Sequence, residues 1–342
     1  MFMAVRSRTL DPLKTFLISV PTLILVVCLV ACGGGAGGMT LHAGTPTAIA
    51  FQSYRALDGS DAINTDQPDG LTPVANIWTI NSDGTGLTPI TQLSGGAYGA
   101  DSTDPQWSPD GTKIIYSSGR ALDGSDNPSV GSAINIWVSN ADGSGATPLT
   151  QMTVYAPCYG VAWSPDGTKI AYFSWRGLDG SNTNAGTSDT HNIWVMNADG
   201  SNNIPITQLS AAGTDSYYPR WSPDGSKLTY YSGRALDGSD APNGQEFTQN
   251  IWIMNADGSG SVPVTQLTGV LSGNQDAYWS KDGSTLVFAG GDGNIYTVQA
   301  DGSGLTQLTT GNALNIPEGW SPDGTKIVFE SSLSVGGGDS SQ

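Results

Sequence analysis

One pentapeptide recurs along this chain and constrains its fold more than any other feature. Trp-Ser-Pro-Asp-Gly, once with Lys in place of Pro, begins at Trp107, Trp163, Trp221, Trp279 and Trp320. The copies lie 41 to 58 residues apart, and each leads into a short run such as Lys-Ile-Ala-Tyr. Repetition on this scale is typical of chains built from identical small units that pack against one another.

Two further elements recur within each unit. Asn-Ile-Trp, or Asn-Ile-Tyr in the last copy, begins at Asn76, Asn135, Asn192, Asn250 and Asn294. An Asp-Gly turn follows it, and then a fourth run that ends in Thr-Gln-Leu or Thr-Gln-Met spans residues 89–93, 148–152, 205–209, 263–267 and 305–308. Each unit therefore holds four short runs with β propensity, separated by turn residues, and none is long enough for a helix. Four strands per repeat predict a β-propeller blade.

The predicted fold class is an all-β propeller of four-stranded blades spanning residues 47–332. The first unit has no Trp-Ser strand, and the last has only the strand at Trp320 and the apolar run Lys326–Phe329 before a polar tail at 333–342. We favour six positions with incomplete terminal blades, because an unpaired apolar strand is unfavourable. Five blades are the alternative.

The copies resemble the propeller repeat of TolB-type proteins, a PD40 or WD40-like repeat. The resemblance rests on Trp-Ser-Pro-Asp-Gly-Thr-Lys-Ile and Ile-Trp-x-Met-Asn-Ala-Asp-Gly and covers about residues 47–331. It implies the fold with high specificity and a function only weakly, since propellers serve many roles. TolB itself carries an additional N-terminal α/β domain, whereas here about fifteen residues separate Cys32 from the first expected strand.

The N-terminal sequence has the pattern of a targeting segment. Basic residues in the first 14 positions precede an apolar run, and the run ends Leu-Val-Ala-Cys at Cys32. This order is similar to the signal peptide and lipobox of bacterial lipoproteins, which implies cleavage after residue 31 and lipid attachment to Cys32. A Gly-rich tether follows, so residues 32–46 form the lipidated link to the propeller. An uncleaved single-span anchor is the alternative, and both place the body in the periplasm or at the cell surface.

Charge and cysteine content limit the classes of function that this chain could have. The chain has 13 basic and 30 acidic residues and a net charge of −17, so we expect no nucleic-acid partner. Most of the aspartates precede glycine, which indicates turn chemistry rather than a ligand site. Of the three cysteines only Cys158 lies in the expected body, so no internal disulfide forms there. We expect a monomer attached to the membrane through its lipid.

One face of the propeller is the candidate binding surface. Strands alternate in direction, so the short Asp-Gly hairpins fall on one face and the long variable loops on the other. Binding residues usually lie on loops that a rigid scaffold presents. The candidate funnel and partner-binding residues on the variable face are Tyr98, Asp104, Tyr155, Tyr159, Asp215, Tyr217, Tyr218 and Asp276. Aromatic and acidic side chains together suit a protein segment or a sugar, although ordinary rim packing also accounts for the tyrosines.

A motif of the form Arg-x-Leu-Asp-Gly-Ser recurs in four of the long loops. The candidate metal ligands in these copies are Asp58, Asp61, Asp123, Asp126, Asp179, Asp237 and Asp240. Ca²⁺ is the one cofactor that such oxygen ligands suggest. The spacing matches no EF-hand, however, and we favour an arginine–aspartate clamp that orders the loop, with no cofactor.

The residues argue against an enzyme. The two histidines are His42, in the tether, and His191, and no Gly-x-Ser-x-Gly elbow or zinc ligand set is present. Two aspartates in a glycan-cleaving site remain an alternative. The favoured function is a lipid-anchored, non-enzymatic scaffold of the cell envelope that binds another protein, TolB-like in its repeats. A carbohydrate- or Ca²⁺-binding module is the second hypothesis.

Overall fold

The computed structural model describes residues 48–60, 74–93, 101–125, 133–153, 156–180, 190–243, 249–267, 275–321 and 323–332, with the side chains of Gln275 and Asp276 excepted. The expected signal, lipidated cysteine and tether, and the tail from 333, lie outside these ranges. Every regular element in the described residues is a strand. No helix in them is long and apolar enough to cross a membrane.

The described strands form six antiparallel sheets. The first contains β1 (Ala48–Ser53), β2 (Asn76–Asn81) and β3 (Thr88–Pro89). The second contains β4 (Ser102–Trp107), β5 (Lys113–Ser118), β6 (Asn135–Asn140) and β7 (Thr147–Pro148). The third contains β8 (Cys158–Trp163), β9 (Lys169–Ser174), β10 (Asn192–Asn197) and β11 (Ile204–Pro205). The fourth contains β12 (Ser216–Trp221), β13 (Lys227–Ser232), β14 (Asn250–Asn255) and β15 (Val262–Pro263). The fifth contains β16 (Gln275–Trp279), β17 (Thr285–Ala289), β18 (Ile295–Gln299) and β19 (Thr306–Gln307), and the sixth β20 (Asn315–Trp320) and β21 (Ile327–Ser331).

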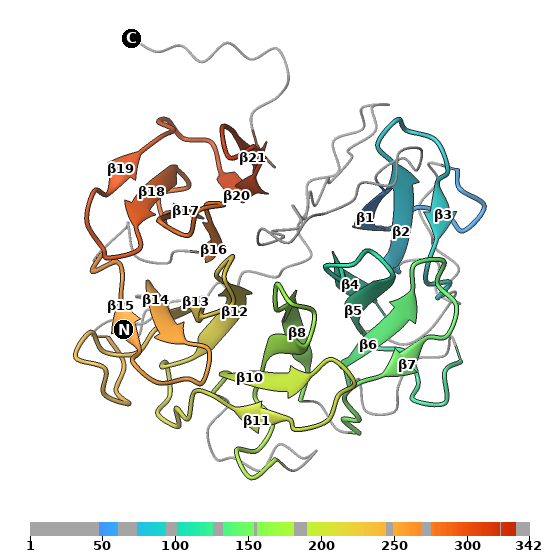
Figure 1. Cartoon of the computed structure of the whole chain (residues 1–342), viewed down its shortest axis with the longest axis horizontal. Helices are drawn as coiled ribbons and strands as arrows, with labels where there is room; N and C mark the ends of the chain where they lie inside the picture. The colour runs from blue at the N-terminus through green and yellow to red at the C-terminus, as the bar shows by residue number, and fades with distance from the viewer. Residues whose placement is uncertain are drawn as a thin grey trace, which may run out of the picture.

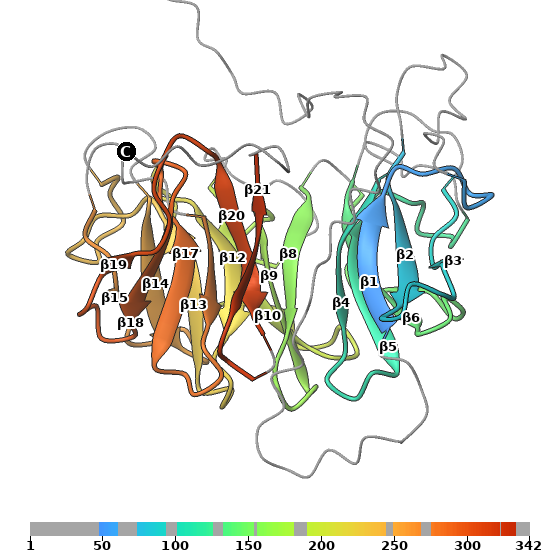
Figure 2. The same cartoon turned by 90° about the horizontal axis from the view of Figure 1, so that it is seen from above.

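The six sheets stand around a common centre, as Figures 1 and 2 show. The innermost strands of the second to sixth sheets are β4, β8, β12, β16 and β20; neighbouring members of this set contact each other, and β1 of the first sheet contacts β4. Such radial packing lets each sheet cover its neighbour, which is the defining geometry of a β-propeller. The all-β propeller prediction is therefore confirmed. The incomplete sheets are the first and the sixth, at the two ends of the strand order, and the number of blades stays a prediction.

The hairpin between the two inner strands follows from its Ser-Pro-Asp-Gly sequence. In the third sheet, Ser164 Oγ donates to Asp166 Oδ1 (2.6 Å) and accepts the Lys169 N–H (2.9 Å). Gly167 closes the turn with φ 69°, a conformation that costs glycine little. The same bonds recur in the second and fourth sheets, so one sequence pattern specifies one hairpin throughout.

The core lies between the sheets. The tryptophans of the Asn-Ile-Trp strands, Trp78, Trp137, Trp194 and Trp252, are at most 1% exposed. In the last three sheets the tryptophan of the innermost strand bonds the preceding sheet: Trp221 Nε1 donates to Ala162 O at 3.1 Å, Trp279 Nε1 to Arg220 O at 3.1 Å and Trp320 Nε1 to Tyr278 O at 3.2 Å. The repeat tryptophans thus fill and connect the inter-sheet spaces, as large aromatic residues do in cores.

The outermost strands differ from the sequence expectation. In the first four sheets the ladder contains two residues that precede the Thr-Gln element, such as Thr147 and Pro148 opposite Val138 and Trp137. The proline has no N–H to donate, but the chain stays bonded beyond it, since the Leu149 N–H donates to Ile136 O at 2.7 Å. Short edge strands containing proline also protect a sheet from pairing with another chain.

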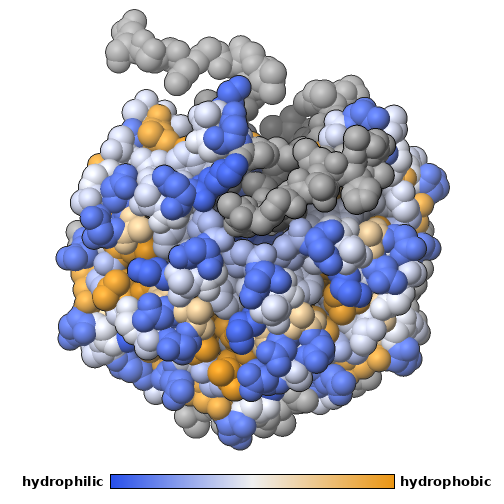
Figure 3. Space-filling view, viewed as in Figure 1, coloured by the Kyte–Doolittle hydropathy of each residue, from blue (hydrophilic) through white to orange (hydrophobic). Residues whose placement is uncertain are grey.

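The long and variable loops emerge on the face opposite the Ser-Pro-Asp-Gly hairpins, because successive strands in each sheet are antiparallel. The view in Figure 3 shows a largely hydrophilic surface on which apolar residues form separate spots, mostly toward the rim.

Candidate functional site

The structure brings part of the expected binding set together. Tyr159 lies on β8 and Tyr217 and Tyr218 lie on β12, while Asp215 directly precedes β12. Asp104 lies on β4, one sheet away. Tyr98 and Tyr155 lie outside the described residues, and of Asp276 only the backbone, in β16, is described. The three tyrosines and Asp215 are all at the end of the sheets that carries the long loops, between the third and fourth sheets.

Around these tyrosines the structure adds residues that the sequence did not single out for binding. The aromatic cluster, as we call it, consists of Tyr159, Phe173, Trp175, His191, Tyr217, Tyr218 and Tyr231. Phe173 lies at its centre, with ring centroids 5.2 Å from Tyr217, 5.1 Å from Tyr218 and 6.0 Å from Tyr159. Tyr159, Tyr217 and Tyr218 are half-buried, so their rings rest on the core and also reach solvent.

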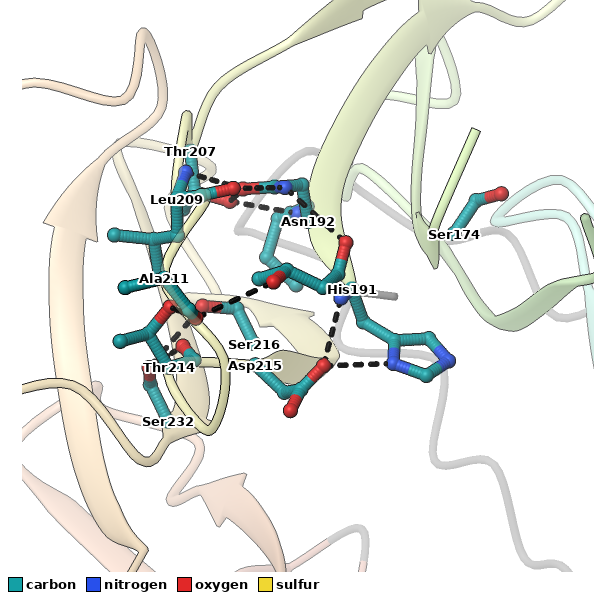
Figure 4. A network of polar contacts seen from close by, with 12 residues as sticks. Ser174, His191, Asn192, Thr207, Leu209, Ala211, Thr214, Asp215, Ser216 and Ser232 are labelled. Carbon is teal, nitrogen blue, oxygen red and sulfur yellow. Dashed lines mark hydrogen bonds and ion pairs between the residues drawn. The ribbon is translucent and has the colours of Figure 1, made fainter. Parts of the chain in front are cut away.

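A polar network lies in one corner of the aromatic cluster (Figure 4). Asp215 Oδ1 accepts the backbone N–H of His191 at 2.7 Å and lies 2.9 Å from His191 Nδ1. Tyr217 also hydrogen-bonds the Asp215 carboxylate. Burial raises the pKa of Tyr217, and the negative charge and hydrogen bond of Asp215 raise it further, so the phenol stays protonated and donates.

The same network orients the imidazole of His191. Its ring lies 4.4 Å from Trp175 and 4.7 Å from Tyr217, measured between centroids, and its side chain is 13% exposed. When the ring is neutral and its proton lies on Nδ1, which faces Asp215, Nε2 is left as an acceptor. Figure 4 shows Nε2 turned away from Asp215. The arrangement is suited to binding a donor from a ligand.

The hydroxyl of Ser174, drawn beside this network in Figure 4, does not complete a catalytic triad. It donates to Ala156 O at 3.4 Å and lies 3.6 Å from Cys158 Sγ, within the third sheet. A hydrolytic triad needs the nucleophile hydrogen-bonded to the second ring nitrogen of the histidine. Within the described ranges, none of the hydrogen bonds of His191 reaches a hydroxyl nucleophile.

One position on the innermost strands has a backbone conformation with positive φ. Asp104 and Tyr218 have φ of 54° and 46°, and Gly160 occupies the same position in β8 with φ 62°. In β4, β8 and β12 this residue forms a β-bulge three residues before the repeat tryptophan. Non-glycine residues held in this region cost about 1–3 kcal/mol, and such strain concentrates at functional sites.

Asp104, which is half-buried, combines this strain with a carboxyl group whose pKa is shifted. Burial raises its pKa, while the Gly160 N–H (3.5 Å), the charge of Arg220 and Thr103 oppose the shift. The Arg220 guanidinium lies 4.6 Å over the ring of Tyr278 and donates to its hydroxyl. Asp104 therefore belongs to a polar group on the innermost strands.

The Arg-x-Leu-Asp-Gly-Ser loops form clamps on the core tryptophans. The guanidinium carbons lie 4.7 to 5.7 Å from the ring centroids of the four buried tryptophans of β2, β6, β10 and β14. Arg120, Arg176 and Arg234 also donate to the carbonyls of Gly124, Gly180 and Gly238. The principal contacts of the arginine are thus an indole and a carbonyl, and the expected aspartate is a lesser partner.

The candidate calcium ligands are dispersed among the described residues. Asp58, Asp123 and Asp237 are exposed and each accepts the N–H of the serine two residues on, while exposed Asp240 accepts from Ser210, Ala211 and Thr214. Asp179 is exposed, and Asp61 and Asp126 lie outside the described ranges. No metal-binding group of three or more acidic, histidine or cysteine residues forms within the described part of the chain. Calcium binding stays a prediction.

Two hollows lie on the hairpin face instead. One, of about 400 Å³, lies between the third and fourth sheets beside Trp221, Pro165 and Pro223. The other, of about 320 Å³, repeats it between the fourth and fifth sheets. The aspartates that line them, Asp166, Asp224 and Asp282, accept hydrogen bonds within their own turns. These hollows follow from the repeat and differ in Lys281, which lines the second hollow at the position where Pro223 lines the first.

The comparisons with known proteins bear on the fold. No family model matches the sequence. The chain is 32% identical over 127 residues to the uncharacterized peptidase YuxL of Bacillus subtilis, covering 34% of this chain and 17% of that protein. It is 30% identical over 129 residues to a TolB homolog of Chlorobium luteolum, covering 37% of this chain and 26% of that protein. The matches therefore span about a quarter or less of these relatives.

Solved structures extend the likeness to most of the chain. TolB of Agrobacterium tumefaciens superposes with a TM-score of 0.54 at 20% identity, covering 78% of this chain and 88% of that one. The fold is that of a TolB-type β-propeller. An oligogalacturonate lyase in complex with manganese superposes with a TM-score of 0.50 at 17% identity, covering 83% and 74%. Since a propeller hosts unrelated functions, this likeness concerns the architecture of the TolB-type propeller and not its activity.

The residues of the aromatic cluster depart from the repeat pattern in the sequence, and the departure becomes visible once the strands are aligned by their register. Phe173 and Tyr231 occupy the position at which the second sheet has Ser117 and the fifth has Ala289. His191 likewise replaces Ile134 in front of the Asn-Ile-Trp element. Departures from a repeat at one shared location indicate a specialised surface.

Proposed function

We propose that this TolB-type propeller is a non-enzymatic binding protein of the bacterial cell envelope that holds a segment of a partner protein. The aromatic cluster carries the proposal. It presents half-buried tyrosines, Asp215 and the Nε2 atom of His191 together on the face with the long loops. Aromatic anchors with a polar tip, supported by a rigid sheet, are typical of protein interfaces.

The charge of the chain supports a neutral or basic partner segment. The net charge is −17, and an acidic protein attracts basic partners and repels acidic ones. Asp215 and the tyrosine hydroxyls would receive and donate hydrogen bonds at the rim, while the ring faces exclude water. Hydrolysis has less support, because His191 lacks a nucleophile among its described contacts.

The lipid anchor is part of the same proposal. It rests on Cys32 and the apolar run before it, and it would hold the propeller at a membrane surface through a flexible Gly-rich link. We expect Cys32→Ser to move the protein from the membrane fraction to the soluble fraction of the cells that make it. An unchanged membrane fraction would argue for an uncleaved span instead.

Site-specific crosslinking tests the proposed function. Benzoylphenylalanine replaces Tyr159 in the full-length protein, or replaces Ile204, which is 48% exposed on outer strand β11, as the matched control. Irradiation of intact cells is expected to give one discrete protein adduct from position 159 and none from position 204. Tyr217→Ala in the same chain should abolish the adduct while the circular dichroism spectrum stays unchanged. Equal adducts from both positions would contradict a binding site here.

A carbohydrate ligand is the second candidate, because exposed tyrosine faces also stack on sugar rings. The acidic chain favours neutral sugars over acidic ones. Calorimetric titration with neutral oligosaccharides separates the two functions. Binding that disappears in Tyr217→Ala, with no protein adduct from position 159, would establish the carbohydrate function and reject the protein partner.

A further inference from the structure

One repeat position on the face with the long loops differs from sheet to sheet. It lies between a strand end and the clamp arginine. Tyr54 occupies it after β1 and Trp175 after β9, whereas Gly119 follows β5 and Gly233 follows β13. The first and third sheets thus present an aromatic side chain where the second and fourth have none. Tyr54 is 40% exposed, so it is not a core residue.

An acidic residue varies in the same way on the sheet that packs against this position. Asp101 directly precedes β4 and Asp215 directly precedes β12, while Pro157 takes this place before β8. Aromatic and acidic residues therefore occur together between the first and second sheets and between the third and fourth. Between the second and third sheets neither occurs. Because the two residues come from different sheets, their joint occurrence indicates a shared role.

The backbone around the two aspartates has the same geometry. Asp101 Oδ1 accepts the Ala75 N–H at 2.7 Å, and Asp215 Oδ1 accepts the His191 N–H at 2.7 Å. In both places the serine that follows the aspartate donates its N–H to the carbonyl of that same residue, at 2.9 Å. We call Tyr54, Ala75 and Asp101 the Tyr54 site. Its equivalent, the His191 site, consists of Trp175, His191 and Asp215 and belongs to the aromatic cluster.

The His191 site shows which chemistry this arrangement accommodates. The imidazole of His191 lies 4.4 Å from the Trp175 ring, measured between centroids, and its Nδ1 lies 2.9 Å from Asp215 Oδ1 (Figure 4). A nitrogen group therefore contacts an aromatic ring and a carboxylate at once. The Tyr54 site keeps the ring and the carboxylate, but Ala75 stands in the place of the histidine. The chain itself thus supplies no nitrogen side chain at this position.

The carboxylate of Asp101 would gain from such a group. Asp101 is half-buried, and burial raises its pKa. Burial also raises the pKa of Tyr54, and the nearby charge of Asp101 raises it further. Within the described ranges, the side chain of Asp101 accepts the Ala75 N–H and pairs with no cation. A partly desolvated carboxylate is stabilised when a cation reaches it. Ala75 is fully buried, so the cation must approach from the solvent side, where Tyr54 is exposed.

We propose that Tyr54 and Asp101 bind the guanidinium group of an arginine from a partner protein. The guanidinium stacks on the phenol ring and donates to the carboxylate, two contacts that its planar shape allows together. The chain contains the first of these contacts elsewhere, since the Arg220 guanidinium lies 4.6 Å over the ring of Tyr278. The net charge of −17 also favours a basic group. The protein source of the arginine rests on the proposed function, whereas the site itself lies between other sheets.

A titration with a small cation tests the site without a partner protein. Fluorotyrosine replaces Tyr54 in the full-length protein in detergent micelles, and its fluorine NMR resonance is followed as argininamide is added. We expect a saturable shift. Citrullinamide has nearly the same shape and no charge, so its affinity should be lower by about tenfold or more. Asp101→Asn should weaken argininamide binding by a similar factor, because the amide keeps an oxygen for the Ala75 N–H and loses the charge.

Two variants serve as controls. Asp58→Asn removes the charge of an exposed aspartate in the loop that follows Tyr54, and it should change the affinity by less than about twofold. Tyr217→Ala alters the aromatic cluster and should leave the titration unchanged. The circular dichroism spectrum of Asp101→Asn should match that of the unaltered protein, which shows that a weaker affinity does not come from unfolding.

The site and its protein partner can fail separately. The site is rejected if argininamide gives no saturable shift, if citrullinamide binds equally well, or if Asp101→Asn and Asp58→Asn have equal effects. The partner is tested by benzoylphenylalanine at position 54, which should give a protein adduct in irradiated cells. Saturable argininamide binding without any such adduct would overturn the protein source of the arginine. Failure of the crosslinking test at Tyr159 would leave the titration unaffected.

Discussion

Four arginines at equivalent positions stack on four buried tryptophans, and their surroundings explain why the residue is arginine. Arg120 is 8% exposed, with its guanidinium carbon 4.9 Å from the centroid of Trp137, and it donates to Gly124 O. A planar guanidinium stacks on an indole and donates hydrogen bonds from its edge at the same time. An ammonium group would satisfy only one of these contacts.

Arg120→Lys is therefore expected to lower the free energy of unfolding by about 1–2 kcal/mol. The loss has two causes: the cation–π contact with Trp137 becomes weaker, and the Gly124 carbonyl keeps a poorer donor. Urea denaturation followed by tryptophan fluorescence measures it. Lys113→Arg, at the exposed start of the same unit's strand β5, is the control and should change little. A lysine variant as stable as wild type would show that the clamp contributes nothing beyond its hydrocarbon stem.

Asp104 gives a second prediction at this scale, because its carboxyl group titrates differently in the folded and unfolded chain. Burial raises its pKa above the ordinary value of 3.8. The native state therefore keeps the proton to higher pH than the unfolded state. The resulting penalty is absent below about pH 4, grows as the pH rises, and is complete once the native carboxyl is ionised.

Asp104→Asn removes this penalty, and asparagine tolerates the positive φ of 54°. We expect the variant to be more stable than wild type at pH 7 and equally stable near pH 3, measured by urea denaturation across that range. Asp110→Asn is the opposite control. Hydrogen bonds from Ser108 and Thr112 lower the pKa of Asp110, so its loss should destabilise the protein at pH 7. A stabilisation by Asp104→Asn that does not change with pH would refute this explanation.

At the scale of the elements, a buried asparagine holds each outer strand in place. Asn135 Oδ1 accepts the Met152 N–H (2.6 Å) and the Thr150 hydroxyl (2.9 Å), and its Nδ2 donates to Met152 O (3.1 Å). Thr150 in turn accepts the Ile136 N–H. The same set of bonds recurs at Asn76, Asn192 and Asn250. This Asn–Thr clasp explains how a ladder of two residues can remain attached to its sheet.

Asn135→Ala is expected to cost about 2–4 kcal/mol, because it leaves the N–H and C=O of Met152 buried without partners. The change is measured as the shift in the urea midpoint multiplied by the slope of the transition. Asn140→Ala, at the other and exposed end of β6, removes only exposed contacts with Ser144 and Lys113 and should cost about 0.5 kcal/mol or less. Similar losses for the two variants would mean that burial of the clasp does not matter.

The repeat predicted the inner three strands of each unit well, because its motifs act locally. Trp-Ser-Pro-Asp-Gly forms the turn between two strands, and Asn-Ile-Trp supplies the buried ring of the third. The outer strand was expected to include Thr150, which instead accepts and donates bonds through its side chain. The expected set of tyrosines was partly brought together, but Phe173 and Tyr231 were missed. Their meeting depends on the packing of two sheets, and such packing is not visible in a linear pattern.

At the scale of the whole molecule, the many Asp-Gly turns both connect strands and carry the negative charge of the protein. In each turn, hydroxyl and backbone N–H donors two residues away hold the pKa of the aspartate below its ordinary value. This applies to Asp83, Asp110, Asp123, Asp142, Asp166, Asp199, Asp224, Asp237, Asp257, Asp282, Asp301 and Asp323. The turns thus keep their negative charges, and the net charge of −17 makes those charges repel one another.

Acid should therefore have two opposing effects on stability. A lowered native pKa contributes stability above the unfolded value, and this contribution is lost as the pH falls toward the native value. For Asp282 and Asp323 the window runs from the ordinary 3.8 down to about 2. Protonation also relieves repulsion, which stabilises the protein, but about 1 M salt screens repulsion over distances beyond about 3 Å.

We accordingly expect a melting temperature that is level above about pH 5 and falls steeply between pH 4 and 2 in about 1 M sodium chloride. At low ionic strength the same descent should be shallower, because relief of repulsion offsets part of it. Scanning calorimetry at the two salt concentrations measures both curves. The turn bonds would be energetically irrelevant if the melting temperature in high salt stayed level to pH 2, since the ring would then be held together by its sheets and tryptophans alone.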